Sequence, residues 1–238
     1  WCAGDVFPIA LGGAHGILPP FMWALQHHPL IAGDLSRRTV VQIDAHADLR
    51  SSLDGEVYSH ACAESRSLDL GIGRLMQVGV RAYSQEESVR IESDEKISTF
   101  FAKDTQAHGT GAVVWQSWLE ALAQISGPVH LTIDIDGLDA SLVPATGTPV
   151  PGGLTFWQAI ETIEAVFAAP NATVISADVN EIATNDHGPL TEFNAAMLAK
   201  KTVACHLKAR QEGRWISSHE AKGKQRTGPM CGYFSQLN

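Results

Sequence analysis

The sequence predicts an α/β fold, a three-layer αβα sandwich around a mostly parallel sheet. Short apolar runs rich in β-branched residues alternate with segments of helical periodicity up to about residue 204. This alternation is typical of βαβ units, in which helices cover both faces of a parallel sheet. Several of the apolar runs also end in acidic residues or histidine. Because ligands bind at the carboxyl edge of such sheets, this second observation predicts a ligand site there.

Apolar runs bounded by turn-forming residues predict the strands, and apolar residues at helical spacing predict the helices. We expect strands at 6–11, 40–43, 75–80, 97–101, 129–133 and 173–177. We expect helices at 20–27, 84–92, 112–125, 155–167 and 192–204. Thr155 and Gln158 form a capping-box pair at the start of the fourth helix. Between 51 and 73 a long polar loop precedes a helical piece.

The domain organisation follows from where this periodicity fades. No repeat or linker divides residues 1–207, so we expect one domain there, followed by a polar carboxyl-terminal tail at 208–238 that packs loosely. The chain begins with Trp1 and enters a strand-like run within a few residues. We therefore expect that the amino-terminal part of the domain is missing.

Composition excludes several classes of partner. The formal net charge is −9 and no block of Lys or Arg is present, which argues against nucleic acid and anionic membrane. No apolar run reaches the roughly 18 residues of a membrane span. The four cysteines are scattered, which favours free thiols in a reducing compartment. We expect a cytoplasmic protein, with organellar targeting left open.

The residues that carry chemistry follow four of the predicted strands. Residues 40–50 read V-V-Q-I-D-A-H-A-D-L-R, and in an extended chain every second side chain of the polar part points to one side. Buried carboxylates repel one another and lose hydration, so a cation between them is the simplest compensation. The full set is His15, Asp44, His46, Asp48, Asp134, Asp136 and Glu181.

The types of ligand indicate the metal. Four aspartates and two histidines without cysteine suit Mn²⁺ better than a thiolate-bound zinc. They exceed what one ion needs, and two ions roughly 3.5–4 Å apart would use them all. Each motif alone has a structural alternative, since an Asp-x-Asp at a strand end is often a turn or cap. Their occurrence at successive strand ends favours metal binding.

The motifs resemble a known family. G-G-A-H (12–15), D-A-H-A-D (44–48) and T-I-D-I-D-G-L-D (132–139) followed by P-A-T-G-T-P-V-P-G-G are similar to the signatures of the ureohydrolases, the arginase and agmatinase family. The resemblance runs from about residue 8 to residue 204. S-H-A-C (59–62) and T-E-F-N-A-A-M-L (191–198) look most like the agmatinase branch. It implies an arginase-like fold.

The resemblance also implies roles for individual residues. His15, Asp48, Asp134 and Asp136 would hold one Mn²⁺. Asp44, His46, Asp134 and Asp136 would hold the second, which makes two ions per subunit with Asp44 and Asp134 as bridges. His60 falls where the family keeps a histidine for proton transfer, and Glu181 where a carboxylate binds the guanidinium group.

The implied reaction is hydrolysis of a small cationic guanidino compound, most simply agmatine, to urea and putrescine by a hydroxide that both ions activate. Asp136 or His60 would protonate the departing amine. Another guanidino or formimino substrate remains open. Family members form homo-oligomers, so we expect a trimer or hexamer.

Three positions depart from the family pattern. Ala14 and Gly16 flank the first histidine where an acidic residue and Ser are expected, and Ala140 replaces Pro. Loss of a carboxylate beside His15 would remove a supporting partner. This motivates the alternative of a catalytically weak subunit that acts through oligomer assembly. A deacetylase-like hydrolase, with its single zinc, fits the second Asp-x-Asp motif less well.

Overall fold

The computed structural model describes residues 6–184 and 188–215, and within these ranges a single sheet organises the chain. The sheet has six strands in the order β1-β6-β5-β2-β3-β4. Every neighbouring pair is parallel, so the predicted parallel sheet is confirmed. The strands are β1 (Ile9–Leu11), β2 (Thr39–Ile43), β3 (Arg74–Val78), β4 (Ile97–Phe100), β5 (Ser126–Asp134) and β6 (Asn171–Asn180).

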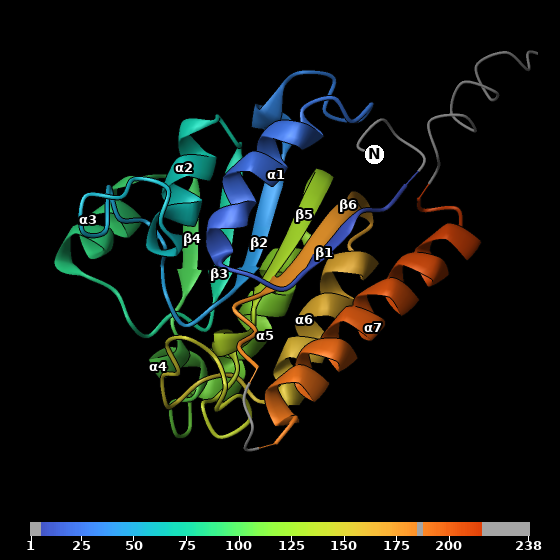
Figure 1. Ribbon diagram of the computed structural model, residues 1–238. Coiled ribbons are helices and arrows are strands. Elements are labelled where there is room, and N and C mark those ends of the chain that lie inside the picture. Colours follow the sequence, from blue (N-terminus) through green and yellow to red (C-terminus); the bar gives the residue numbers. More distant parts are fainter. Residues whose placement is uncertain (1–5, 185–187, 216–238) are drawn as a thin grey trace, which may run out of the picture.

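Helices cover both faces of the sheet, as Figure 1 shows. One face carries α1, α2 and α3, and the other face carries α5, α6 and α7. The predicted three-layer αβα sandwich is therefore confirmed. The helices are α1 (Leu18–Leu25), α2 (Ala63–Asp69), α3 (Gln85–Ser93), α4 (Ala102–Thr105), α5 (Gly111–Ala123), α6 (Phe156–Ala168) and α7 (Leu190–Gln211).

The central strand β2 explains why two hydrophobic cores form. All five of its residues are buried. Val40 packs in the core beneath α1 and α2, whereas Val41 and Ile43 pack in the larger core beneath α5, α6 and α7. Successive side chains of a strand point to opposite faces, so a strand covered on both sides is apolar almost throughout. Gln42, a polar residue inside this strand, is fully buried and supports the site described below.

Local signals place the element ends close to the predicted positions. The Thr155 side chain accepts from the Gln158 backbone, and the Gln158 side chain accepts in return, so the predicted capping box at α6 is confirmed. The strand predicted at 6–11 begins only at Ile9, since Pro8 has no N–H to donate to a ladder. No helix in the described residues is long and apolar enough to cross a membrane.

The carboxyl-terminal boundary differs from the expected one at Leu207. Helix α7 continues to Gln211, Ala209 is buried, and Trp215 is only 4% exposed. Trp215 packs edge-on against His206 with ring centroids 4.9 Å apart. Apolar contacts at Ala209 and Trp215 therefore keep residues 208–215 in the packed domain, although their neighbours are polar. Residues 216–238 lie outside the described residues.

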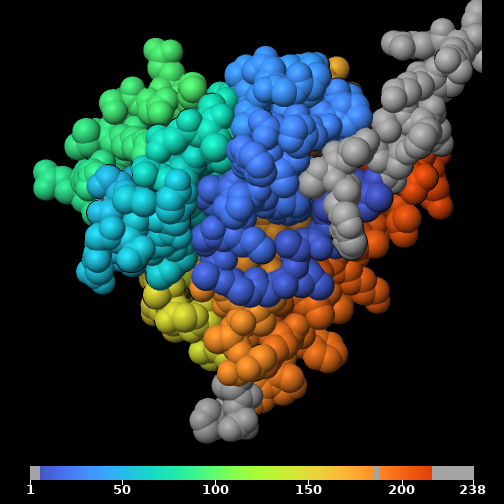
Figure 2. All heavy atoms as spheres, turned by 45° about the horizontal axis from the view of Figure 1, so that its top comes forward, coloured from blue at the N-terminus to red at the C-terminus, as the bar shows by residue number. Residues whose placement is uncertain are grey.

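The amino-terminal segment contacts elements on both sides of the sheet, α7 on one side and α2 on the other (Figure 2). Phe7 stacks on His206 of α7 with a centroid distance of 4.2 Å, while α1 packs beside α2 on the opposite side. In Figure 2 the blue segment accordingly lies between the orange α7 region and the cyan segment that precedes α2. β1 is thereby held at the sheet edge next to β6, where its following loop can reach the site.

Trp215 provides a test of the corrected boundary. Replacement of a buried Trp by Ala typically costs about 3–5 kcal/mol, so Trp215→Ala should lower the free energy of unfolding by roughly 3 kcal/mol in urea titrations. Trp157→Ala is the matched control, because Trp157 is 72% exposed and its loss should change stability by less than about 0.5 kcal/mol. Equal effects of the two substitutions would contradict packing of residues 208–215.

Candidate metal centre

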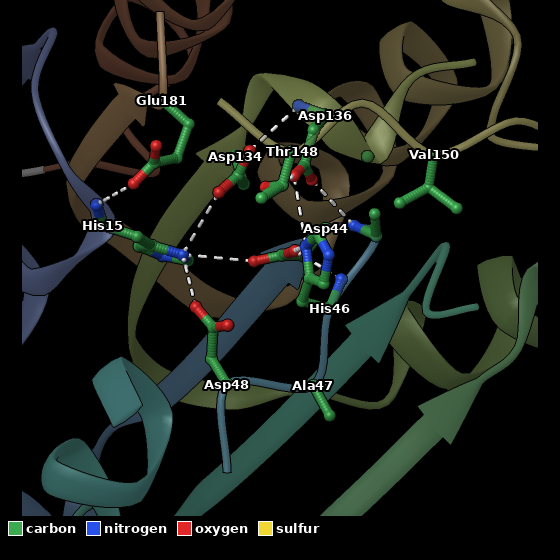
Figure 3. Close-up of polar contacts among 12 residues, drawn as sticks. His15, Asp44, His46, Ala47, Asp48, Asp134, Asp136, Thr148, Val150 and Glu181 are labelled. Atoms are coloured by element: carbon green, nitrogen blue, oxygen red, sulfur yellow. Dashed lines mark hydrogen bonds and ion pairs between the residues drawn. The ribbon is translucent and has the colours of Figure 1, made fainter. Parts of the chain in front are cut away.

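The predicted site residues lie at the ends of four strands, on one edge of the sheet (Figure 3). His15 follows β1, Asp44, His46 and Asp48 follow β2, Asp134 and Asp136 lie at the end of β5, and Glu181 follows β6. β1, β6, β5 and β2 are successive neighbours in the sheet. The side chains therefore converge for the reason that the sequence indicated, namely that parallel strands end on the same side.

A glycine turn carries the chain from β1 to His15. Gly12 and Gly13 both have positive φ, at 107° and 56°, which residues with a Cβ rarely adopt. The Gly12 N–H donates to the Val179 carbonyl at 2.9 Å, and the Glu181 N–H donates to the Gly13 carbonyl at 2.9 Å. The turn is thus bonded to the end of β6, and this bonding places His15 beside Glu181.

The aspartates and histidines form two overlapping groups that share Asp44. His15, Asp44 and Asp48 make the first group, and Asp44, His46 and Asp136 make the second. His15 Nδ1 lies 3.1 Å from Asp44 Oδ2 and 2.8 Å from Asp48 Oδ2. His46 Nδ1 lies 3.1 Å from Asp136 Oδ2 and 3.6 Å from Asp44 Oδ1. A carboxylate shared in this way has the position of a bridge between two ions.

Asp134 stands between the two groups. Its Oδ2 is 3.5 Å from His15 Nδ1, and its Oδ1 accepts the Asp136 N–H at 2.9 Å. Asp136 in turn accepts from the Ala45 N–H at 3.0 Å and lies 3.2 Å from the Thr148 hydroxyl. The loop after β5 is thus bonded to the loop after β2, which brings both Asp134 and Asp136 next to Asp44.

Asp48 reaches the cluster differently from the simple extended-chain expectation. Ala45 and Ala47 are fully buried and point away from Asp44 and His46, so strand-like alternation persists for a few residues beyond β2. Asp48 then adopts φ of 53°, in the left-handed region. The extended interpretation is therefore wrong for Asp48, which is turned into the cluster by a strained backbone of the kind found at functional sites.

The surroundings of His15 Nδ1 show that these side chains are suited to hold a cation. His15 Nδ1 is completely buried with three carboxylate oxygens within 3.5 Å of it, and none of these contacts has the geometry of a hydrogen bond. A buried polar atom without a partner is costly, and so are carboxylates that face one another. A divalent cation among these oxygens and nitrogens would satisfy them together, and the oxygen-rich ligand set favours a hard ion.

Without such a cation, the ionisation equilibria of the cluster are displaced. Burial lowers the pKa of His46, but contacts with Asp136 and Asp44 outweigh it and raise this pKa to about 10. Burial and the charge of Asp44 raise the pKa of Asp48 to about 7. Burial and the charges of Asp44 and Asp136 raise the pKa of Asp134 in the same way. The cluster therefore retains protons in place of missing positive charge.

Glu181 and His60 are placed at different depths. Glu181 has φ of 55°, and its Oε1 accepts the His15 backbone N–H at 2.6 Å. Its Oε2 faces Gly147, where a Cβ would lie 3.7 Å away. His60 is exposed at the start of a short 3-10 turn, and no hydrogen bond or ion pair between its side chain and the described carboxylates is present. The structure brings Glu181 into the site and leaves His60 near its rim.

Comparisons with known proteins agree with these motifs and this geometry. The family model described as "Arginase family" matches residues 2–205. The chain belongs to the arginase family. A curated relative named N(1)-aminopropylagmatine ureohydrolase, from Synechocystis, is 36% identical over 83% of this chain. An agmatinase from Pyrococcus horikoshii is 32% identical over 80% of it.

Solved structures have the same fold. The agmatine ureohydrolase of Thermoplasma volcanium superposes with a TM-score of 0.69 and 30% identity, over 87% of this chain and 64% of that one. The described sheet and helices thus have the arginase-family fold. The chain spans 60% of the length of the Synechocystis and Pyrococcus relatives.

Two departures from the family pattern have a local explanation. A Cβ on Gly16 would lie 2.9 Å from the Tyr58 carbonyl, so the loop before His60 occupies the space that a Ser side chain needs. Ala14 is exposed and precedes the short 3-10 turn that begins at His15. A carboxylate at this position would have stood at the surface, while His15 itself is fully buried and contacts Thr132.

Sequence reasoning missed a set of buried polar residues that support the site. Gln42 donates to Asp44 Oδ2 at 2.7 Å, Gln77 donates to Gln42 at 2.5 Å, and Thr99 donates to Gln77 at 2.7 Å. This ladder crosses three strands and orients Asp44. The available signal was a glutamine inside each of two apolar strands, V-V-Q-I and L-M-Q-V. Such residues need partners when they are buried.

Three further missed residues lie deeper. Thr132 and Asp178 are fully buried and connect to His15 through hydrogen bonds. Glu64 of α2 is also fully buried, neither of its carboxyl oxygens has a hydrogen-bond partner, and burial raises its pKa well above the ordinary value. Its backbone N–H donates to the Asp48 carbonyl at 3.1 Å, so α2 is attached directly to the ligand loop.

Asp48 allows a controlled test of metal binding. Asp48→Asn removes one charge, and Asn tolerates left-handed φ. We expect Mn²⁺ affinity measured by calorimetry to fall by more than the roughly 10–100-fold typical of losing a supporting group. Asp54→Asn is the matched control, since exposed Asp54 has nearly the same φ of 51° but stands apart from the cluster. Equal affinity of the two variants would refute the ligand assignment.

The pKa shifts also predict how the metal-free chain responds to pH. The raised pKa of His46 contributes stability that is complete below about 6.5, its unfolded value, and is lost as pH rises through about 10. The raised pKa of Asp48 acts in the same direction at lower pH, since stability falls as pH rises from about 4 to about 7. Thermal midpoints in chelator should therefore fall between pH 6.5 and pH 10. A rise over that interval would contradict the described His46 contacts.

Proposed function

We propose that this chain is a binuclear manganese hydrolase that cleaves a small cationic guanidino compound to urea and an amine. The observation that supports it best is the shared Asp44, which joins two ligand groups. Two divalent ions at these groups would lower the pKa of a water molecule enough to supply hydroxide near neutral pH. His15, Asp44, His46, Asp48, Asp134 and Asp136 would hold them.

Glu181 is the residue we assign to the substrate. One carboxylate oxygen already accepts from the His15 backbone, and the other faces Gly147. A planar guanidinium pairs well with such a carboxylate, which would supply charge and hold the reacting carbon beside the aspartate cluster. Guanidinium is resonance-stabilised and a weak electrophile, so orientation of its carbon toward the attacking oxygen is a large part of what the chain must provide.

The departing amine requires a proton. When the carbon–nitrogen bond breaks, its electron pair stays on nitrogen, and the amine leaves readily only if that nitrogen is protonated. Asp136 is the first candidate for the proton donor, because it lies inside the cluster. Its Oδ2 is 3.2 Å from the Thr148 hydroxyl. His60, exposed near Gly16, would serve by exchanging protons with solvent at the rim.

Two substrates are supported by different relatives. The sequence motifs favour agmatine, which would give urea and putrescine. N(1)-aminopropylagmatine is the second candidate, because relatives of that name from Synechocystis and Thermus thermophilus are 36% identical to this chain. The agmatinase from Pyrococcus horikoshii is 32% identical, as is a further aminopropylagmatine ureohydrolase from Thermococcus kodakarensis. Both compounds carry the same guanidinium, and the second has an additional aminopropyl group, which lengthens the tail and adds one amine. We further propose a homo-oligomer, a trimer or hexamer, located in the cytoplasm.

The assay measures urea release by the Mn²⁺-loaded chain from agmatine, N(1)-aminopropylagmatine, arginine and guanidinobutyrate. We expect release from one of the first two compounds, and the ratio of their kcat/KM values decides between them. Stoichiometric Mn²⁺ without urea from any compound would refute the hydrolase and favour a catalytically inactive subunit that acts through assembly.

Glu181→Gln tests substrate recognition separately from folding. The glutamine oxygen can still accept from the His15 N–H, but the negative charge is lost. Loss of one partner from a close ion pair costs at least about 2 kcal/mol, so kcat/KM should fall by roughly 30-fold or more. Glu95→Gln, on the exposed turn before β4, serves as the control and should retain wild-type kinetics. Unchanged kinetics in Glu181→Gln would exclude its assigned role.

A further inference from the structure

A buried chain of hydrogen bonds holds His15 on the side opposite the carboxylate cluster. His15 Nε2 lies 2.9 Å from the Thr132 hydroxyl oxygen. That hydroxyl donates to Asp178 Oδ1 at 2.7 Å. All three residues are fully buried, and they come from the loop after β1 and from neighbouring strands β5 and β6.

The direction of the bonds follows from a count of protons. A threonine hydroxyl carries one hydrogen and can donate only once. Because Thr132 donates to Asp178, its oxygen is left as an acceptor toward His15. His15 Nε2 must then carry a hydrogen and donate it. The ring nitrogen that remains for the cluster is Nδ1, the buried atom that faces Asp44 and Asp48.

Asp178 is itself held as an acceptor. Its Oδ1 also accepts from Asn180 Nδ2 at 2.6 Å, and its Oδ2 lies 2.7 Å from His130 Nε2. His130 Nδ1 lies 2.8 Å from the Ser176 hydroxyl, which completes the ring's contacts. Thr132 and Asn180 thus donate to Oδ1, and His130 Nε2 faces Oδ2. A proton on Oδ1 directed at Thr132 would leave the Thr132 hydroxyl without this acceptor.

We propose that Thr132 and Asp178 are positioning residues that keep the hydrogen of His15 on Nε2 and so reserve Nδ1 for a metal ion. Neutral imidazole binds a metal through the nitrogen that lacks hydrogen, and the partner of the other nitrogen decides which one that is. The effect on metal affinity rests on the proposed function. The assignment of the hydrogen rests on the described bonds alone.

These hydrogen bonds also explain how His15 is held in place although its neighbour is Ala14. The motif pattern suggested that Ala14 removes a partner of the histidine, yet the described contacts of the imidazole come from β5 and from the cluster. Support therefore arrives from two strands far away in sequence. Thr132 lies 117 residues from His15, which is why inspection of the G-G-A-H motif cannot find it.

Two substitutions that preserve side-chain shape test whether the direction of these hydrogen bonds affects Mn²⁺ affinity. Thr132→Val keeps the shape but removes the hydroxyl, so His15 Nε2 loses its acceptor, and Mn²⁺ affinity should fall about 10–100-fold. Asp178→Asn keeps the shape but introduces an N–H. That group can donate to Thr132, whose hydroxyl then turns toward His15 and places the imidazole hydrogen on Nδ1. We expect Asp178→Asn to lose more affinity than Thr132→Val.

Two further variants serve as controls. Thr132→Ser keeps the hydroxyl and should retain most of the affinity. Thr202→Val removes another fully buried threonine hydroxyl, one that donates only to the Leu198 carbonyl of α7, and should leave Mn²⁺ affinity unchanged. Thermal unfolding and circular dichroism establish that each variant folds. If Thr132→Val does not fold, Asp178→Asn and Thr132→Ser still test the inference.

The ring nitrogen can be observed directly. In the Cd²⁺-loaded protein with isotope-labelled histidine, spin coupling between cadmium and nitrogen identifies the bound atom of His15. We expect coupling to Nδ1 in the wild type and a hydrogen on Nε2, with the coupling lost or reduced in Asp178→Asn. Coupling to Nε2 in the wild type, wild-type Mn²⁺ affinity in folded Asp178→Asn, or equal losses in Thr132→Ser and Thr132→Val would overturn the inference. Failure of the proposed function would appear separately, as absence of urea from a wild type that shows the Nδ1 coupling.

Discussion

Electrostatic repulsion among buried carboxylates is the constraint on which the rest of the structure depends. Asp44, Asp48, Asp134 and Asp136 are at most 3% exposed and stand at one edge of the sheet with two imidazoles for compensation. Such an arrangement costs free energy unless positive charge enters it. Protons supply that charge in the metal-free cluster, as the raised pKa values of His46 and Asp48 indicate. A bound divalent cation would replace those protons.

The parallel sheet makes this concentration of charge possible. Its strands begin in two ordinary apolar cores and end together, so each loop contributes one or a few side chains of the cluster at little additional conformational cost. Rigid neighbours then restrict each ligand. A glutamine ladder orients Asp44, a threonine and an aspartate orient His15, and Arg81 donates to the carbonyls of Asp136 and Val150 at 2.8 and 2.6 Å. These supports lie in the strands or close to their ends.

Strained backbone occurs where two assigned residues enter the site. Asp48 and Glu181 both have φ near 55°, a conformation that costs a residue with a side chain about 1 kcal/mol or more. Both are bonded through their backbones: the Asp48 carbonyl accepts from Glu64 and Ser65, and the Glu181 N–H donates to Gly13. The neighbouring elements thereby hold conformations that the two residues would rarely adopt alone. Each turn redirects a carboxylate toward the cluster.

The sequence by itself determined the alternation of strands and helices, the parallel sheet and the ligand-bearing strand ends. These depend on periodicity and on local motifs, which are properties of neighbouring residues. Only the tertiary structure decided the supports of His15 and Asp44, the turn at Asp48, the packing of Trp215 and the peripheral place of His60. Thr132 and His15, or Gln77 and Asp44, meet because separate strands pair in one register, and no local pattern encodes that pairing. Long-range register therefore determines which nitrogen and which oxygen face the site.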